Sequence, residues 1–341
     1  MDPLSQVTLG AAAAVALSRR GERGRAMIIG GLAGAVPDLD VLISSAEDPL
    51  LQLQYHRHFT HSIFMAPVIG VLVGVLLCLF GRIRSLGWGR VILFGVMGAL
   101  THGLLDACTS YGTQLLWPLS DLRVSWDVIS IIDPIFTLPL LILLIVSVLR
   151  NSAVWVRCGL VLALVYLGGG WIQRERAQEW ALQLAEARGH PVERVSARPS
   201  FANLVLWRTV YQSEGRYYVD AVNLRPGREA VFYPGKSVPL FSEADAEVLI
   251  ADNPILEWDL RRFRHFSQGF LYRWPTHPEI VSDLRYSVFP DSVDPLWGVD
   301  LSTSTPAGHV NFGSYREVES GSFQRLWKMI CGEPIPTGDQ R

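Results

Sequence analysis

Histidines and aspartates recur at the ends of uncharged segments in the first 135 residues. The stretch YHRHFTHS, at residues 55–62, contains three histidines directly before a long uncharged run. The candidates for metal binding are His56, His58, His61, Asp38, Asp40, His102, Asp106, Asp127 and Asp133. Neutral imidazole and carboxylate together suit Zn²⁺, Mn²⁺ or Fe²⁺, whereas a set made only of oxygens suits Mg²⁺ or Ca²⁺. The residue types therefore indicate a divalent metal site, with Zn²⁺ as the first choice and one to three ions.

The spacing of these residues favours some candidates over others. His102 and Asp106 are four apart, so on a helix they share one face and can bind one ion. They lie inside an apolar segment, where ionisable groups are costly and usually functional. A hydrogen-bonded pair between helices is the structural alternative. Asp38 and Asp40 follow Pro37, in a loop that can bridge neighbouring ions or simply form a turn or a helix cap.

Other candidates have equally ordinary interpretations. A single histidine near a helix start is usually a hydrogen-bonded residue, although three together favour binding by at least two. Asp133 precedes a proline and can simply start a helix. Asp127 is expected to have an ordinary role at the membrane interface. Arg57 can neutralise a phosphate or extend toward lipid headgroups.

The composition places the chain in a membrane. Only 18% of the residues are charged and 49% are hydrophobic, whereas a soluble domain carries about 25% charge. A helix needs roughly 20 apolar residues to cross the hydrocarbon core. Four clear spans are predicted, at 62–81, 91–109, 128–149 and from about 153 to 173. Two shorter apolar segments, at 4–17 and 26–36, predict a helical hairpin in which Gly30, Gly31, Ala33 and Gly34 allow close packing.

The distribution of arginines predicts the orientation. The connections at 18–25, 82–90 and 150–157 hold nine arginines, whereas those at 37–61 and 107–127 hold only Arg57 and Arg123. Positively charged connections stay in the cytoplasm. All the candidate metal ligands are then expected at the exterior end of the bundle, which is periplasmic in a Gram-negative cell.

The residues after the last span read as a soluble domain. The runs LVLWRTVY, RYYVDAVNL and EAVFYPG predict strands, and EADAEVLI predicts a short helix. The predicted architecture is an all-α polytopic membrane bundle at 1–172 followed by an exterior α+β domain at 173–341. Four scattered cysteines indicate neither a disulfide framework nor a thiolate metal site. The net charge of −2 argues against a nucleic-acid partner.

Four motifs resemble one family in their order and approximate spacing. GLAGAVPDLD, HRHFTHS, HGLLDACTSYGTQLLWP and IIDP are similar to the YdjM-like family of predicted inner-membrane metal-dependent hydrolases, strongly over about 1–150. That family is distantly similar to zinc-dependent phospholipase C and single-strand nucleases, which are helical enzymes with clustered zinc ions. The resemblance implies an inner-membrane protein that acts on phospholipids.

The resemblance also implies a set of site residues. Its probable ligands correspond to Asp38, Asp40, His56, His61, His102, Asp106 and, less closely, Asp133. Arg57, Thr60 and Ser62 complete the HRxxTHS signature and are expected to support the ligands or contact substrate. His58 is left out because the family commonly has a small residue there. Asp38, Arg57 and Asp106 are the candidate catalytic residues.

The predicted function is hydrolysis of a phosphodiester or related ester in a membrane lipid or another amphiphilic substrate. Water activated by metal would attack the ester at the exterior membrane interface. Two alternatives remain open. The metal can merely stabilise a non-catalytic membrane scaffold, or the chain can be a transporter. A transporter is disfavoured because its polar residues should lie near the bilayer midplane.

Overall fold

The computed structural model describes residues 1–250, 253–305, 308–316 and 320–335. The chain divides into two compact units. Unit 1 comprises Met1–Ile43 and Tyr55–Trp171, and unit 2 comprises Ser44–Gln54 and Ile172–Arg341. The main division lies next to the predicted boundary at 172, but the predicted membrane domain had included segment 44–54.

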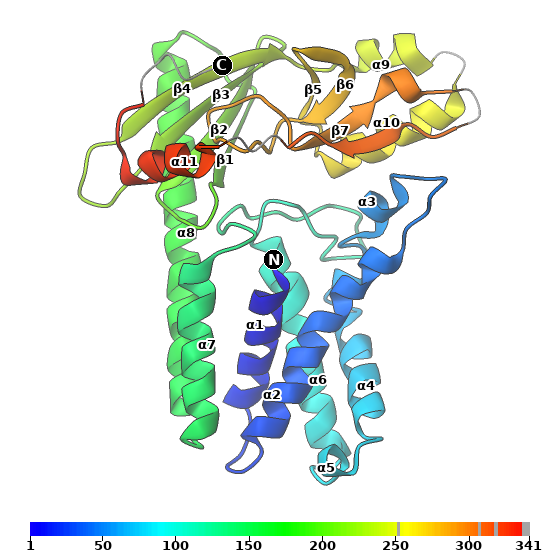
Figure 1. The fold of residues 1–341 in the computed structure, drawn as a ribbon, viewed down its shortest axis with the longest axis vertical. Coiled ribbons are helices and arrows are strands. Elements are labelled where there is room, and N and C mark those ends of the chain that lie inside the picture. Colours follow the sequence, from blue (N-terminus) through cyan, green and yellow to red (C-terminus); the bar gives the residue numbers. More distant parts are fainter. Residues whose placement is uncertain (251–252, 306–307, 317–319, 336–341) are drawn as a thin grey trace. The chain divides into compact units, whose positions relative to one another are not determined.

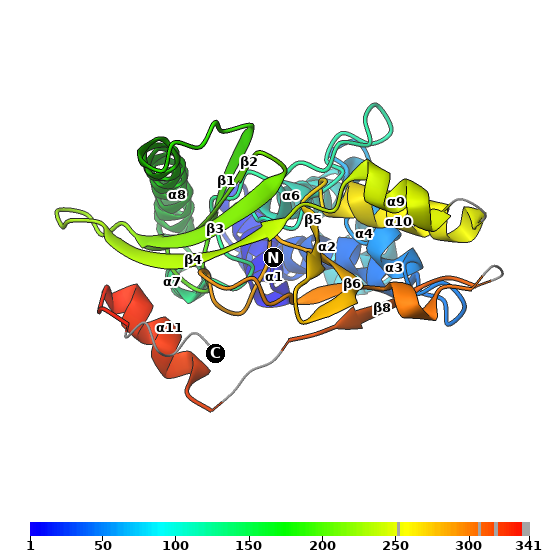
Figure 2. The same cartoon turned by 90° about the horizontal axis from the view of Figure 1, so that it is seen from above.

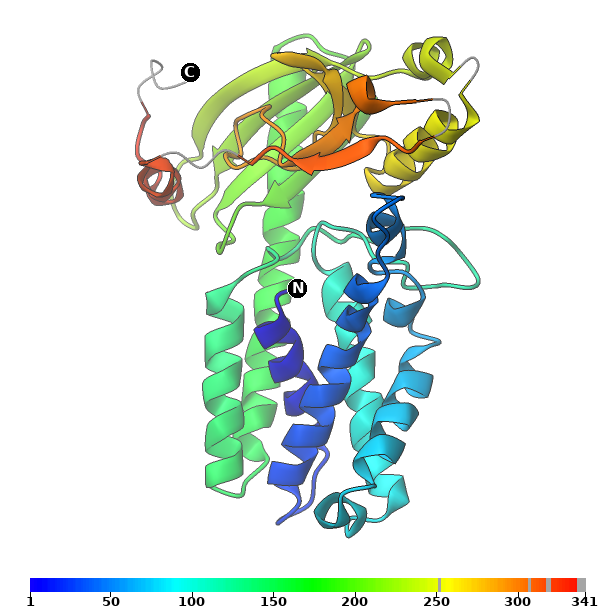
Figure 3. The ribbon, with the colours of Figure 1, turned by 45° about the vertical axis from the view of Figure 1, so that its right-hand side comes forward.

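Unit 1 is helical (Figures 1 and 3). Its long helices are α1 Pro3–Ala16, α2 Arg23–Ala35, α4 Ala66–Leu77, α6 Trp88–Ala107, α7 Pro134–Leu149 and the first part of α8 Val154–Ala187. Shorter elements are the 3₁₀ helices η1 Val36–Leu42 and η2 Phe59–His61, with α3 Leu51–Tyr55 and α5 Gly81–Arg84. Helix α1 packs against α2, α6 and α7, and α4 packs against α6.

Glycines let three of these helices approach closely, as the sequence predicted for the N-terminal hairpin. A Cβ added at Gly10 would lie 2.5 Å from the carbonyl oxygen of Gly30, and one added at Gly98 would lie 2.3 Å from the same oxygen. No real side chain tolerates such distances, so α1, α2 and α6 can meet here only through glycine. The hairpin predicted at 4–17 and 26–36 is confirmed as α1 and α2.

The membrane spans are fewer and less regular than predicted. Among the residues that the structure describes, two helices, α6 and α8, are long and apolar enough to cross a membrane. A third candidate is added if Leu51–His61 and Ala66–Leu77, which meet at 81°, form one broken span. The predicted span at 62–81 is therefore wrong as a continuous helix. Residues 62–65 and 78–81 lie outside α4, which has Pro67 in its first turn.

The predicted span at 128–149 is also too long. Helix α7 has only 16 residues because Asp133 caps it and Pro134 starts it. Conversely, α8 has 34 residues and continues to Ala187, beyond the predicted end of the last span at about 173. About four spans were predicted, and the described residues contain two to three candidate spans by length and composition.

Unit 2 contains two antiparallel four-stranded sheets, which Figures 1 and 2 show. The first has the order β1 Arg194–Pro199, β2 Leu206–Ser213, β3 Arg216–Asn223, β4 Val231–Pro239. The second has the order β5 Leu271–Trp274, β6 His277–Asp283, β7 Trp297–Asp300, β8 Asn311–Ser314. The three predicted strands correspond to β2, β3 and β4, so the α+β prediction is confirmed for this domain.

Helices cover the sheets of unit 2. Ala177 of α8 packs with Trp207 and Val222 of the first sheet, and Met329 of α11 Ser322–Cys331 packs with Leu206 and Tyr233. The predicted helix EADAEVLI is α9 Glu243–Ile250, and it is followed by α10 Pro254–Phe266. A further 3₁₀ helix, η3 Leu301–Thr303, lies between β7 and β8.

Candidate metal centre

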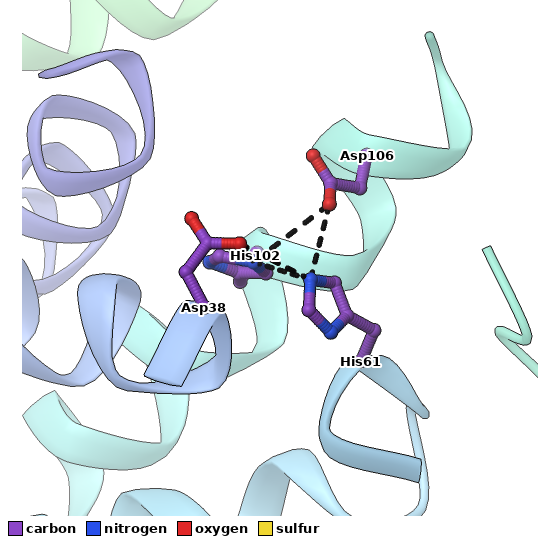
Figure 4. A group of neighbouring side chains, drawn as sticks. All are labelled: Asp38, His61, His102 and Asp106. Atoms are coloured by element: carbon purple, nitrogen blue, oxygen red, sulfur yellow. Dashed lines mark hydrogen bonds and ion pairs between the residues drawn. The ribbon is translucent and has the colours of Figure 1, made fainter. Parts of the chain in front are cut away.

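Four of the predicted ligands meet at one end of the unit 1 helices (Figure 4). Asp38 lies in η1, His61 ends η2, and His102 and Asp106 lie in the last turns of α6. Each contributes one potential ligand atom, and these atoms all lie within 4.8 Å of one another. The connections between α1 and α2, between α4 and α6, and between α7 and α8 lie at the opposite end of the helices (Figure 1). The arginine-rich connections and the candidate site are therefore at opposite ends of unit 1.

The distances among the four side chains match those expected around one metal ion. The Nε2 atoms of His61 and His102 are 2.9 Å apart, and each lies 3.4 Å from Oδ1 of Asp38. Oδ2 of Asp106 is 3.1 Å from the first Nε2 and 3.8 Å from the second. In a tetrahedral site with metal–ligand bonds of about 2.0–2.2 Å, neighbouring ligand atoms lie about 3.3–3.6 Å apart. The observed separations of 2.9–3.8 Å lie around this range, so the four residues could hold a metal ion.

Hydrogen bonds made by the outer ring nitrogens orient both imidazoles. Nδ1 of His102 lies 2.6 Å from the carbonyl oxygen of Gly34, which can only accept. Nδ1 of His61 lies 3.2 Å from a carboxylate oxygen of Asp40. If each Nδ1 carries the ring proton, the two Nε2 atoms face each other with their lone pairs. Two such lone pairs in a buried site repel each other unless a positive charge lies between them, and either a metal ion or a proton shared by the two rings supplies that charge.

Asp40 supports the group from its edge. Its buried carboxylate accepts hydrogen bonds from the hydroxyl of Thr60, at 2.8 Å, and from the backbone N–H of Arg57, at 3.0 Å, and it lies 2.8 Å from Nδ1 of His56. Burial alone would raise the pKa of Asp40, but the hydrogen bonds from His56 and His61 hold this pKa well below its ordinary value. The predicted ligands Asp40 and His56 thus lie beside the four-residue group, where they orient His61.

Arg57 places a positive charge against the same group. Its Nε lies 3.0 Å from Oδ2 of Asp106, and its guanidinium donates to the hydroxyl of Thr109 at 2.8 Å. The guanidinium also lies 4.7 Å from the ring centroid of Tyr111. The backbone of Arg57 has a φ of +62°, a conformation that non-glycine residues rarely adopt. Arg57 is thus a buried arginine held beside the four-residue group.

Gln6 of α1 is a site residue that the sequence did not indicate. Its side-chain amide donates to Oδ1 of Asp106 at 2.8 Å, and the Met1 amino group contacts the same oxygen. These contacts leave Oδ2 of Asp106 facing the imidazoles. Gln6 is completely buried within a mostly apolar helix. In the sequence, the available signal was a glutamine inside a mostly apolar segment, because a buried amide needs a hydrogen-bond partner.

Two histidine and aspartate candidates lie elsewhere. Asp133 is the N-cap of α7, where it accepts hydrogen bonds from two backbone N–H groups and, at 2.7 Å, from the hydroxyl of Tyr166. The structure therefore does not bring Asp133 into the metal group, because Pro134 starts the helix and makes Asp133 its cap. His58, which was left out of the predicted set, packs against aromatic rings, with its centroid 5.7 Å from that of Trp117.

The fold and the site define a helical membrane protein with a buried group of histidines and aspartates. The sequence profile of the YdjM inner membrane protein family matches residues 1–177, so this chain belongs to that family, as its motifs predicted. The chain is similar to the inner membrane protein YbcI of Escherichia coli (strain K12), with 34% identity over 114 residues that cover 31% of this chain and 62% of that protein.

A second relative extends the similarity beyond the membrane unit. The chain is 22% identical to the uncharacterized protein YfhP of Bacillus subtilis (strain 168) over 280 residues, which cover 75% of this chain and 80% of that protein. No solved structure matches the chain significantly. The comparisons thus establish an inner-membrane family.

Proposed function

We propose that the chain is a membrane-bound metal-dependent hydrolase. Its substrate would be a phosphodiester or related ester in a lipid or another amphiphile, cleaved at the exterior membrane interface. The observation that carries this proposal is the arrangement of His61 and His102, whose Nε2 atoms lie 2.9 Å apart between two carboxylates. Acceptor atoms this close together in a buried site repel one another unless a cation lies between them.

The residues of the site have separable roles in the proposed reaction. Asp38, His61, His102 and Asp106 would hold the ion. When bound, a divalent ion acts as a Lewis acid that acidifies water and stabilises negative charge on an ester oxygen. The water oxygen would form the new bond to phosphorus, the bond to the leaving alcohol would break, and the water proton would end on that alcohol.

Asp38 is the residue best placed to move this proton. A quarter of its side chain is exposed, whereas the side chains of His61, His102 and Asp106 are fully buried. One carboxylate oxygen faces the imidazoles and the other points away from them (Figure 4). The oxygen that points away from the imidazoles would accept the proton from water.

An amphiphilic substrate suits the surroundings of Asp38 and Arg57. Leu39, between Asp38 and Asp40 in η1, is 57% exposed, and Leu42, two residues after Asp40, is 75% exposed. Apolar side chains at the rim of a charged site suit a molecule with an acyl chain and a polar headgroup. Arg57 would favour a negatively charged headgroup such as a phosphodiester.

The non-catalytic alternative also has an observation in its favour. Three of the four candidate ligands have no exposed side-chain surface, which is typical of a closed structural metal site. In that case the ion would stabilise the junction of η1, η2 and α6 without any reaction. A transporter is less favoured, because the four residues group at one end of the helices rather than near their middle.

Two matched pairs of variants test the metal assignment. We expect the purified full-length protein to hold stoichiometric metal, and Asp106→Asn and His61→Ala to lose it. Asp133→Asn and His58→Ala should retain the metal because their side chains make other contacts. Elemental analysis of each protein gives the result. If Asp106→Asn and His61→Ala bound as much metal as the wild type, a proton shared by the histidines would explain the site, and the proposal would fail.

The reaction is tested on phospholipid vesicles. Vesicles of phosphatidylethanolamine and phosphatidylglycerol are incubated with the metal-loaded protein, and the released headgroups or lipids are measured by mass spectrometry. We expect hydrolysis that a chelator abolishes and added Zn²⁺, Mn²⁺ or Fe²⁺ restores. Stoichiometric metal with no hydrolysis, together with a large loss of thermal stability on chelation, would favour the scaffold.

A further inference from the structure

Segment 44–54 joins two pieces of unit 1 but belongs to unit 2. Its neighbours in the chain, Ile43 and Tyr55, are both assigned to unit 1. The preceding helix η1 contains Asp38 and Asp40, and the residues that follow the segment contain His56 and His61. Both ends of segment 44–54 therefore continue directly into stretches that carry site residues.

A bidentate ion pair holds the segment within unit 2. The guanidinium of Arg262, in α10, donates to the two carboxylate oxygens of Asp48 at 2.7 and 2.9 Å and to the side chain of Gln54 at 3.3 Å. The side chains of Arg262 and Asp48 are only 6% and 18% exposed. Burial would raise the pKa of Asp48, but the hydrogen bonds and charge of Arg262 hold this pKa below its ordinary value. Both partners are thus charged at neutral pH.

Asp259 fixes the position of Arg262. Its fully buried carboxylate accepts a hydrogen bond from Arg262 at 2.5 Å and another from the backbone N–H of Val310 at 2.9 Å. Nδ1 of His309 lies 2.8 Å from the same carboxylate. Because each oxygen of Asp259 already has a donor, the guanidinium is held in one orientation, in which both of its terminal nitrogens donate to Asp48.

The same residues resemble a second metal group by distance alone. Asp48, Asp259 and His309 have potential ligand atoms within 4.8 Å of one another. However, Arg262 donates to both carboxylates, and a guanidinium stays charged at any physiological pH. A divalent cation would have to displace this buried positive charge. The geometry is that of an ion-pair anchor.

We infer that Asp48 and Arg262 are positioning residues for the proposed metal centre, through the chain segments that carry its ligands. When segment 44–54 is held in place, the end of η1 and the start of residues 55–61 are restricted as well. These two stretches then sample fewer conformations. The importance of this anchor for metal binding rests on the function proposed above. The anchor itself can be tested whether or not metal is present.

The first test measures hydrogen exchange in the full-length protein. Asp48→Asn removes the charge but keeps an oxygen that can accept from the backbone N–H of Leu50. Arg262→Lys keeps the charge but loses the bidentate contact. Arg261→Lys is the matched control, because Arg261 lies next in the same helix and pairs with the exposed Glu257. Peptides from 36–42 and 55–61 are followed by mass spectrometry.

We expect amides in these peptides to exchange roughly fivefold faster in Asp48→Asn and Arg262→Lys, with no change in Arg261→Lys. Exchange in strands β1–β4 should be unchanged in all three variants. Unchanged exchange at both 36–42 and 55–61 in the two anchor variants would overturn the inference.

Metal release provides the second measurement. In protein loaded with Zn²⁺, transfer to a chromogenic chelator should be several-fold faster in the two anchor variants than in the wild type and Arg261→Lys. Faster exchange with unaltered metal release would overturn the positioning role. If the wild type bound no metal at all, the proposed function would fail, whereas hydrogen exchange would still decide whether the anchor orders the two stretches.

Discussion

At the scale of single residues, the two ring nitrogens of His61 have different partners. Nδ1 faces Asp40, and Nε2 faces His102, Asp38 and Asp106. A carboxylate on the outer nitrogen fixes the orientation of a metal-binding imidazole and makes it more basic. Asp40 was predicted as a ligand, and its contacts instead give it this supporting role. Residue type and spacing alone do not separate a ligand from the carboxylate that orients it.

The supporting role of Gln6 leads to a prediction at this scale. Gln6→Leu removes the 2.8 Å hydrogen bond to Asp106 while filling a similar volume. Loss of such a supporting contact typically weakens metal binding by about 10–100-fold. We expect a decrease of roughly tenfold, since the Met1 amino group still contacts the carboxylate. Competition with a chelator of known affinity measures the change, and an unaltered affinity would contradict the assigned role.

At the scale of elements, glycines set how closely the site-bearing helices approach their neighbours. A Cβ added at Gly103, in α6 between His102 and Asp106, would lie only 2.1 Å from the carbonyl oxygen of His61. The backbone of His61 can therefore contact α6 only where α6 has no side chain. This contact brings the imidazole of His61 beside that of His102.

Gly103→Ala should accordingly disrupt the site while α6 itself remains helical. The methyl group must push η2 away from α6, so we expect metal content to fall well below stoichiometric. Gly89→Ala is the control on the same helix, because a Cβ there meets no atom within 4 Å. Elemental analysis and circular dichroism of both variants provide the comparison. Full metal content in Gly103→Ala would show that η2 and α6 need not be in contact.

At the scale of the whole chain, the asymmetry of arginines provides a testable orientation. The arginine-rich connections lie at the end of the unit 1 helices opposite the C-terminal ends of α2 and α6, where the candidate site lies (Figure 1). If they remain in the cytoplasm, the candidate site and residues after α8 lie outside it. This orientation is part of the proposal for hydrolysis of a lipid at the exterior interface.

Reporter fusions test the orientation. Alkaline phosphatase fused after residue 341 should be active, because it folds only outside the cytoplasm, whereas green fluorescent protein at the same point should be dark. Fusions after Asn151, between α7 and α8, should give the reverse result. A fluorescent fusion at the C-terminus would place unit 2 in the cytoplasm and would exclude an exterior site.

The sequence alone determined the features that depend on local patterns. Apolar runs predicted helices, alternating β-branched and aromatic runs predicted strands β2–β4, and the motifs around His61 and His102 predicted the family. Helix limits were less predictable where a polar residue and a proline started the helix late, as Asp133 and Pro134 do for α7. Local signals work here because they reflect the conformational preferences of neighbouring residues.

Only the tertiary structure decided which polar residues meet. It brought Asp38, His61, His102 and Asp106 together, left Asp133 as a helix cap, and added Gln6 from α1. It also assigned segment 44–54 to unit 2 through Asp48 and Arg262. Such contacts join residues that are remote in sequence, so they depend on how closely glycine-lined helices pack and how strands pair. The glycines indicated which helices could approach closely, but not which polar side chains this approach would bring together.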